Sequence, residues 1–185
     1  LYVTDIDRLK AIDTKSGKTI HTWKIPGSTF LNDVAVTKDS VVYFTDSDKS
    51  TIHKLRKGVL SVVRVDTSLG GTNGVYVDGN TLHLAGYQSG NIYTMNLDDQ
   101  SIQKFATGIP SGDGLEKYRE GWIATNWNGE IYYIDNMGKV SMLMDTKQRM
   151  NSADIEVIEE KDLLLVPTFF SNKVVAYRIH VDGHN

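Results

Sequence analysis

The segment LNDVAVTKDSVVYFTDSDKSTIHKLRKGVLSVVRV, at residues 31–65, contains four short runs that are rich in Val, Ile, Tyr, Phe and Thr. Polar turn residues separate these runs, among them the DSDKS stretch and the single glycine. Such runs are typical of short β-strands joined by tight turns. The segment therefore predicts a unit of four strands, at residues 34–36, 42–45, 51–55 and 61–65.

The same unit recurs along the chain with a period of about 40 residues. Its opening polar residue is Asn32 in LNDVAV, Asn73 in TNGVYV and Asp113 in GDGLEKY, at intervals of 41 and 40 residues. A further 40 residues leads to Ala153 in SADIEV. An all-β repeat of this length, with four strands in each copy, is typical of a β-propeller blade. We therefore expect an all-β propeller of four-stranded antiparallel blades.

The repeat assigns residues 1–185 to one propeller domain, with no linker or second domain. It predicts whole blades at residues 31–67, 72–107 and 112–146, and partial blades at 1–26 and 152–179. Closed propellers normally contain about 4–8 blades. We therefore expect an incomplete ring, which missing N-terminal blades or a partner chain would complete.

The composition narrows the function classes. At 40% hydrophobic and 23% charged residues, the chain can bury a core, which argues against disorder. Lys and Arg total 20 against 23 Asp and Glu, and a net charge of −3 argues against nucleic acid or an anionic membrane as partner. No apolar run approaches the ~20 residues of a membrane-spanning helix. The lack of cysteine excludes disulfides and thiolate metal sites without fixing the compartment.

The opening polar residues form the main candidate site. The first strand of each propeller blade lines the central channel, so Asn32, Asn73 and Asp113 are expected to converge around the axis. Amide and carboxylate oxygens are the ligands that calcium, magnesium and manganese prefer. The alternative is structural, because Asn-Gly and Asp-Gly are common turn dipeptides and these side chains often bond local backbone.

Other motifs give weaker signals. Asp46, Asp48 and Ser50 have the spacing of the first EF-hand ligands, but Thr51 replaces the required glycine and Lys57 replaces the bidentate glutamate, so a polar hairpin turn is expected. The serine-hydrolase elbow, the Walker A motif and the G-x-G-x-x-G motif are all missing. A further group consists of large aromatic residues, for which packing between blades is expected rather than a sugar-stacking platform. Its members are Trp122, Trp127, Phe169 and Phe170.

Four segments together resemble the senescence marker protein (regucalcin)/gluconolactonase family. They are LNDVAV with YFTDSD, TNGVYV, GDGL with NWNGEIYYID, and ADIEVIEEKDLLLVPTFFSNKVVAY. The resemblance spans residues 1–177 and implies a six-bladed propeller with a divalent cation in its channel. It implies that Asn73 and Asp113 bind the metal, that Asp113 also serves as the acid/base, and that Asn32 binds the substrate. Calcium is the expected ion, with magnesium, manganese and zinc as alternatives.

Two positions depart from the family pattern. Phe30 stands where the family's Arg-x-Asn-Asp substrate motif has its arginine. The family's metal-binding glutamate of the first blade has no counterpart in this chain. By the resemblance, the chain corresponds to the C-terminal two-thirds of the ring.

Two functions follow as hypotheses. The first is a metal-dependent hydrolase of sugar lactones or related esters, in which the cation activates the lactone carbonyl and the attacking water. Its substrate would be a small-molecule lactone or sugar acid. The alternative is a non-catalytic binding propeller of the NHL-repeat kind, because a propeller scaffold hosts many functions. Three oxygen-bearing side chains in one register favour the metal channel over a pure scaffold.

Overall fold

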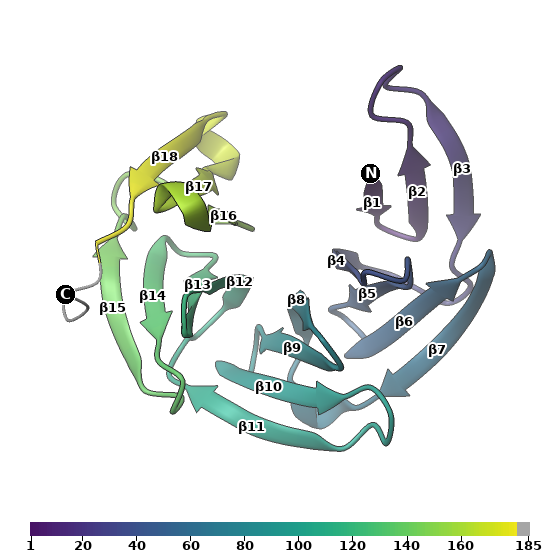
Figure 1. Ribbon diagram of the computed structural model, residues 1–185, viewed down its shortest axis with the longest axis horizontal. Coiled ribbons are helices and arrows are strands. Elements are labelled where there is room, and N and C mark those ends of the chain that lie inside the picture. The colour runs from purple at the N-terminus through teal and green to yellow at the C-terminus, as the bar shows by residue number, and fades with distance from the viewer. Residues whose placement is uncertain (181–185) are drawn as a thin grey trace.

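The computed structural model describes residues 1–180, which form five antiparallel sheets arranged around a common axis (Figure 1). Three sheets have four strands and two have three. In each sheet, consecutive strands of the chain pair with one another. The expected all-β propeller of antiparallel blades is confirmed. The last five residues of the predicted domain, 181–185, lie outside the described part of the chain.

The strands follow the repeat of the sequence. The first sheet contains β1 (Tyr2–Asp5), β2 (Arg8–Ile12) and β3 (Thr19–Lys24). The second contains β4 (Leu31–Val36), β5 (Val42–Asp46), β6 (Thr51–Arg56) and β7 (Val59–Val65). The third contains β8 (Thr72–Asp78), β9 (Thr81–Gly86), β10 (Asn91–Asn96) and β11 (Ile102–Thr107). The fourth contains β12 (Gly112–Tyr118), β13 (Gly121–Asn126), β14 (Glu130–Ile134) and β15 (Val140–Asp145), and the fifth β16 (Glu156–Ile158), β17 (Leu163–Pro167) and β18 (Val174–Arg178).

The chain forms five sheets, whereas the family that it resembles implies a ring of six blades. The sheets β1–β3 and β16–β18 lie at the two ends of the arc in Figure 1. The strands β4, β8 and β12 face the axis, and the outer strands β7, β11 and β15 lie on the circumference.

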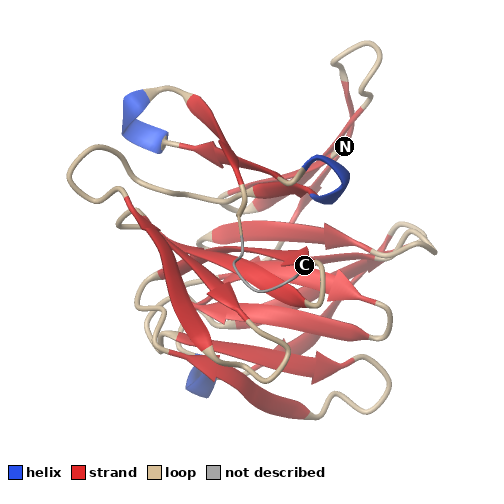
Figure 2. Ribbon diagram, turned by 60° about the vertical axis from the view of Figure 1, so that its left-hand side comes forward, coloured by secondary structure: helices blue, strands red, loops and turns tan. Residues whose placement is uncertain are grey.

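Within the described residues, helical structure is confined to three short turns in the loops, which are drawn in blue in Figure 2. They are η1 (Thr67–Leu69), η2 (Glu159–Lys161) and η3 (Phe169–Ser171). Accordingly, within residues 1–180 no helix is long and apolar enough to cross a membrane.

The hydrophobic core is divided among the four interfaces between neighbouring sheets. Each interface has its own cluster of buried side chains, because both faces of an inner sheet are covered by another sheet. The second strands therefore read as nearly continuous apolar runs, and every residue of β5 and β13 is buried. One pair from each interface illustrates the clusters: Leu9 with Phe44, Ile52 with Leu84, Ile92 with Trp122, and Ile123 with Leu164.

The Asp46–Ser50 segment is the hairpin turn between β5 and β6, as expected. Asp46 is fully buried, and its carboxylate accepts hydrogen bonds from the backbone N–H of Thr29 at 3.1 Å and of Lys49 at 3.3 Å. This carboxylate therefore closes a turn, and the EF-hand alternative has no support.

Candidate functional site

A break in strand pairing positions each opening polar residue. In β8, the pairing with β9 jumps from Thr72 to Val75, which leaves Asn73 outside the regular ladder. Equivalent jumps in β4 and β12 occur at Asn32 and Asp113. Such a β-bulge bends the strand and re-aims the side chain. The three residues therefore leave the alternation of their strands at the same point of each repeat.

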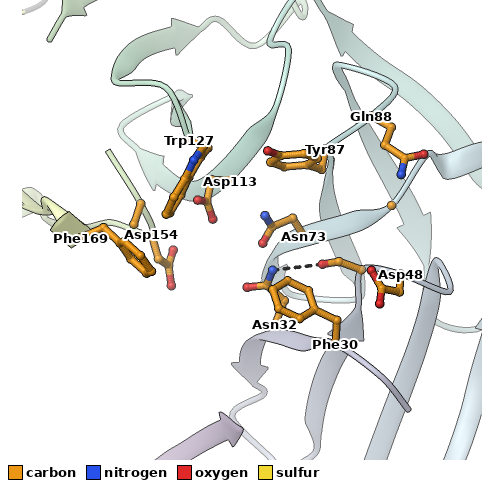
Figure 3. Close-up of a pocket in the computed structure, with 13 residues that line it drawn as sticks. Phe30, Asn32, Asp48, Asn73, Tyr87, Gln88, Asp113, Trp127, Asp154 and Phe169 are labelled. Atoms are coloured by element: carbon orange, nitrogen blue, oxygen red, sulfur yellow. Dashed lines mark hydrogen bonds between the residues drawn. The ribbon is translucent and has the colours of Figure 1, made fainter. Parts of the chain in front are cut away.

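Asn32, Asn73 and Asp113 line one pocket, which has a volume of about 470 Å³ (Figure 3). The three residues that the repeat singled out therefore share one pocket. A fourth residue, Asp154 of the fifth sheet, lines the same pocket and was missed. The repeat interval leads to Ala153, and the acid is the next residue. A search for polar residues that included the next residue of each repeat could have found it.

Threonine side chains fix the backbone of the opening residues. In three neighbouring pairs of sheets, a threonine hydroxyl donates to the carbonyl of the opening residue of the next sheet, always 28 residues along the chain. The pairs are Thr4 with Asn32, Thr45 with Asn73 at 2.7 Å, and Thr125 with Ala153 at 2.9 Å. The wall of the pocket is therefore held in place from one sheet to the next.

Asn73 carries an unusual oxygen. Its side chain is only 5% exposed, and its buried Oδ1 atom has no hydrogen-bond partner among the described residues. Buried polar atoms are nearly always hydrogen-bonded, because an unpaired one loses its hydration without compensation. Figure 3 shows Asn73 and Asp113 on the wall of the same pocket, and their backbones are close neighbours, since a Cβ atom at Gly74 would lie 2.0 Å from the carbonyl oxygen of Asp113. The unpaired oxygen therefore indicates a binding position beside the Asp113 carboxyl.

Asp113 is 8% exposed. Burial, and secondly the negative charge of Asp154, raise the pKa of Asp113 to about 7. The half-buried Asp33 also has a raised pKa, because desolvation and the charge of Asp154 both disfavour its ionised form. Like charges at one site raise each other's pKa, and a bound cation reverses that effect.

The donor set fits a hard divalent cation, since it consists of amide and carboxylate oxygens. The amide of Asn73 and the carboxyl of Asp113 lie on adjacent inner strands, and two more acids, Asp48 and Asp154, line the pocket. Within residues 1–180, no group of three His, Asp or Glu side chains has the arrangement of a metal centre. A cation here would therefore depend on the Asn73 amide as well as on carboxylates.

Glu116 is a second acid that the sequence did not single out. It lies on β12, three residues after Asp113, and it is half-buried. Burial and the charges of Glu156 and Asp154 raise its pKa to about 8. The signal that could have identified it is an acid in an inner strand whose first four residues are buried. Glu116 does not belong to the residues that line the pocket.

The aromatic residues divide into two groups. Trp122 is 6% exposed and packs between the third and fourth sheets, as expected. The rings of Phe169 and Phe170, after β17, pack against Trp127, after β13, with 4.6 and 6.0 Å between the ring centroids, so these residues also pack between sheets, but outside the core. Trp127 and Phe169 line the pocket, and Phe169 and Phe170 are 55% and 73% exposed. The reason is positional: Trp127 and Phe169 follow their strands, in loops at the pocket mouth, whereas Trp122 lies inside β13.

No protein-family profile matches the chain, and no curated protein matches it. Solved structures share its fold. An inactive variant of virginiamycin B lyase from Staphylococcus aureus, with quinupristin, is 14% identical with a TM-score of 0.75, over 94% of this chain and 60% of that one. A gluconolactonase from Xanthomonas campestris is 18% identical with a TM-score of 0.71, over 88% and 62%. A nidogen/laminin complex is 15% identical with a TM-score of 0.82, over 96% of this chain and 73% of that one.

These similarities establish the β-propeller fold and no more, because all the identities are below one-fifth. The chain spans about 60% of the length of the lyase that it matches.

Proposed function

We propose that this protein is a metal-dependent hydrolase of lactones or related esters, similar to the senescence marker protein/gluconolactonase family. The observation that carries the proposal is the buried, unpaired Oδ1 of Asn73 beside the Asp113 carboxyl. Asn73 and Asp113 would hold the cation, for which calcium is the first candidate and magnesium, manganese and zinc are alternatives. A divalent cation in such a site polarises a carbonyl group and lowers the pKa of water. The gluconolactonase among the structural neighbours gives further support.

Asp113 is the proposed general base. Without a cation its pKa is raised to about 7, and a bound cation would lower that pKa, so the carboxylate would be ionised and able to accept a proton at neutral pH. Its place on the pocket wall lets the carboxylate reach a water molecule inside the cavity. Asp113 therefore accepts the proton of the attacking water.

Asn32 is the proposed substrate-orienting residue. Its Nδ2 donates to the hydroxyl of Ser47 at 3.1 Å, and that hydroxyl donates to the carbonyl of Thr72 at 2.9 Å (Figure 3). The two bonds fix the plane of the amide in the pocket wall. Asn32 can therefore hold a polar group of the substrate without a loss of side-chain freedom on binding.

A binding propeller without catalysis is the second candidate. Its support is the similarity to a nidogen/laminin complex, at a TM-score of 0.82. In that case, the loops at the pocket mouth would hold a protein partner. The two functions differ in what they require of Asn73 and Asp113, since a protein-binding surface needs no unpaired oxygen beside a buried acid.

The test combines calcium titration by calorimetry with hydrolysis of a panel of lactones. The wild-type chain should bind calcium and hydrolyse lactones, and Asp113→Asn should lose most of the turnover and weaken calcium binding, because the amide cannot accept the proton. Asp99→Asn is the matched control, since Asp99 is an exposed acid on the turn between β10 and β11. A chain that neither binds a cation nor hydrolyses any lactone would exclude the hydrolase and favour the binding propeller.

A further inference from the structure

Four aromatic side chains form a collar around the pocket, and each comes from a different sheet (Figure 3). Phe30 precedes β4, Tyr87 follows β9, Trp127 follows β13 and Phe169 lies in η3 after β17. We call these four residues the aromatic collar. They surround the position of Asn73 and Asp113, so a ligand that reaches the acid contacts aromatic surface on several sides.

The backbone under the collar is fixed before any ligand binds. The N–H of Tyr87 donates to the carbonyl of Gly71 at 2.8 Å, and the N–H of Trp127 donates in the same way to Ser111 at 2.9 Å. The side-chain amide of Asn151 donates to the carbonyl of Trp127 at 2.9 Å. A rigid aromatic surface binds an apolar group with a small entropic cost.

Phe169 shows a second sign of constraint. Its φ of 48° lies in the left-handed region, which is unfavourable for a bulky side chain. Its ring packs edge-on against Trp127, with 4.6 Å between the ring centroids, while the side chain stays 55% exposed. Strained backbone of this kind often occurs at ligand-binding positions. The local structure therefore holds the Phe169 ring exposed at the pocket wall.

Among the described residues, the pocket is lined by acidic side chains and by no basic ones. Asp48, Asp113 and Asp154 line it, and none of its lining residues within the described chain is Lys, Arg or His. Lys49 is next to Asp48 in sequence, but its amino group donates to the carbonyl of Gly27. In the absence of a bound cation, a carboxylate on the substrate would therefore meet negative charge and no cationic side chain of this chain.

We infer that the substrate is an uncharged lactone or ester with an apolar acyl or aryl substituent, rather than a polyhydroxylated sugar lactone or a sugar acid. This inference rests on the proposed hydrolase function. The acids and amides at the floor of the pocket contact the ester group, and the aromatic collar contacts the substituent. Apolar surface that leaves water gains affinity roughly in proportion to its area, whereas a polyhydroxylated ring loses hydration against aromatic walls.

The first experiment compares kcat/KM for γ-butyrolactone, γ-nonanolactone and D-glucono-1,5-lactone with calcium present. A fully buried methylene contributes up to about fourfold, so we expect γ-nonanolactone to exceed γ-butyrolactone by at least ~50-fold. D-glucono-1,5-lactone should be the poorest of the three. A preference for D-glucono-1,5-lactone over γ-nonanolactone would overturn the inference.

The second experiment separates the substrate class from the hydrolase function. Tryptophan fluorescence is titrated with cyclopentanone, 2-pentylcyclopentanone and gluconate, none of which has an ester bond to hydrolyse. We expect 2-pentylcyclopentanone to bind most tightly and gluconate most weakly. If no lactone is hydrolysed but this order holds, the hydrolase proposal fails while the pocket's preference for apolar, uncharged ligands stands. Equal binding of all three ligands overturns the inference.

Variants of the collar complete the test. Phe169→Ala should weaken binding of 2-pentylcyclopentanone by about tenfold, because truncation of an aromatic anchor typically costs more than 1 kcal/mol. Val174→Ala is the control, since Val174 is a 67% exposed apolar residue of the same sheet and does not line the pocket. Phe30→Arg should raise affinity for gluconate at least tenfold, and Phe30 is a 44% exposed loop residue whose replacement the fold tolerates. An equal loss from Phe169→Ala and Val174→Ala, or no change from Phe30→Arg, would overturn the inference.

Discussion

The backbone N–H of Val75 donates to the Asp33 carboxylate at 2.7 Å, and this bond joins the bulge of β4 to that of β8. The other Asp33 oxygen accepts from the N–H of Val34, also at 2.7 Å. Asp33 directly follows Asn32, which lines the pocket. The repeat therefore uses two adjacent positions of the bulge, one for the pocket and one for the contact with the next sheet.

Asp33→Ala should lower the free energy of unfolding by about 1–2 kcal/mol, because two backbone N–H groups lose their acceptor. Loss of its charge beside Asp154 offsets part of the cost. Asp135→Ala is the matched control: Asp135 also accepts from two backbone N–H groups, of Met137 and Lys139, but in an exposed turn where water replaces it. Denaturant unfolding measures both. Equal losses for the two variants would contradict the structural role of Asp33.

Gly74→Ala should destabilise the protein far more than Asp33→Ala. A Cβ atom at Gly74 would lie 2.0 Å from the backbone carbonyl oxygen of Asp113, and neither backbone can move without breaking an inner strand. We expect a loss of more than ~3 kcal/mol, or failure to fold. Gly58→Ala is the control, since a Cβ there meets no atom within 4 Å and only the positive φ of 79° costs about 1–2 kcal/mol. Thermal unfolding of both variants checks the difference. A Gly74→Ala protein as stable as Gly58→Ala would show that the inner strands do not approach so closely.

The sequence was most informative where the repeat is strict. The 41- and 40-residue intervals predicted the sheets, and they predicted that Asn32, Asn73 and Asp113 share a pocket, because equivalent positions of a propeller meet at its axis. Asp154 was missed because the repeat interval leads to Ala153, and in the fifth sheet the acid is one residue later, before β16 begins. The roles of metal ligand and catalytic base stay predictions.

The aromatic collar could not be predicted from residue type alone. Tyr87 and Trp127 are 40 residues apart and follow the second strands of their sheets, so the repeat did contain a signal. The general tendency of aromatic residues to pack in cores obscured it. Only the position relative to the strand end distinguishes Trp127 in the pocket from Trp122 in the core.

His83 should make the protein sensitive to acid. It is 8% exposed, and its ring lies 3.8 Å from that of Trp122. Burial lowers its pKa to about 4, while Asp78 raises it slightly and Lys117 lowers it. The folded state therefore binds the proton less readily than the unfolded chain, and stability is lost as the pH falls from about 6.5 to about 4. The full effect is about 3 kcal/mol, at 1.36 kcal/mol for each pH unit.

His83→Phe keeps an aromatic ring against Trp122 and removes the titration. Its free energy of unfolding should fall less than that of the wild type between pH 6.5 and pH 4, as followed by urea unfolding at each pH. His21→Phe is the control, because His21 is also stacked on a tryptophan, Trp23, at 4.2 Å, but is exposed. It should keep the wild-type pH dependence. A His83→Phe profile parallel to that of the wild type would mean that His83 is not the acid-sensitive group.

Asn73→Leu tests the cation site, because the sign of its effect on protein stability should depend on whether a cation is bound. Without cation, the wild type bears the cost of a buried oxygen that has no partner, and leucine of similar volume removes that cost. In EDTA we therefore expect Asn73→Leu to be as stable as the wild type or more stable, by roughly 1 kcal/mol. With calcium, the wild type gains stability from the bound ion and the variant does not, so the order reverses.

Asn91→Leu is the control, because Asn91 lies on β10 and donates one hydrogen bond to Tyr93 at 2.9 Å. It should lose up to about 1 kcal/mol in both conditions and keep the full calcium shift. Melting temperatures of the three proteins in EDTA and in calcium decide the matter: an Asn73→Leu protein that is less stable than the wild type in EDTA, or that retains the calcium shift, would remove Asn73 from the site.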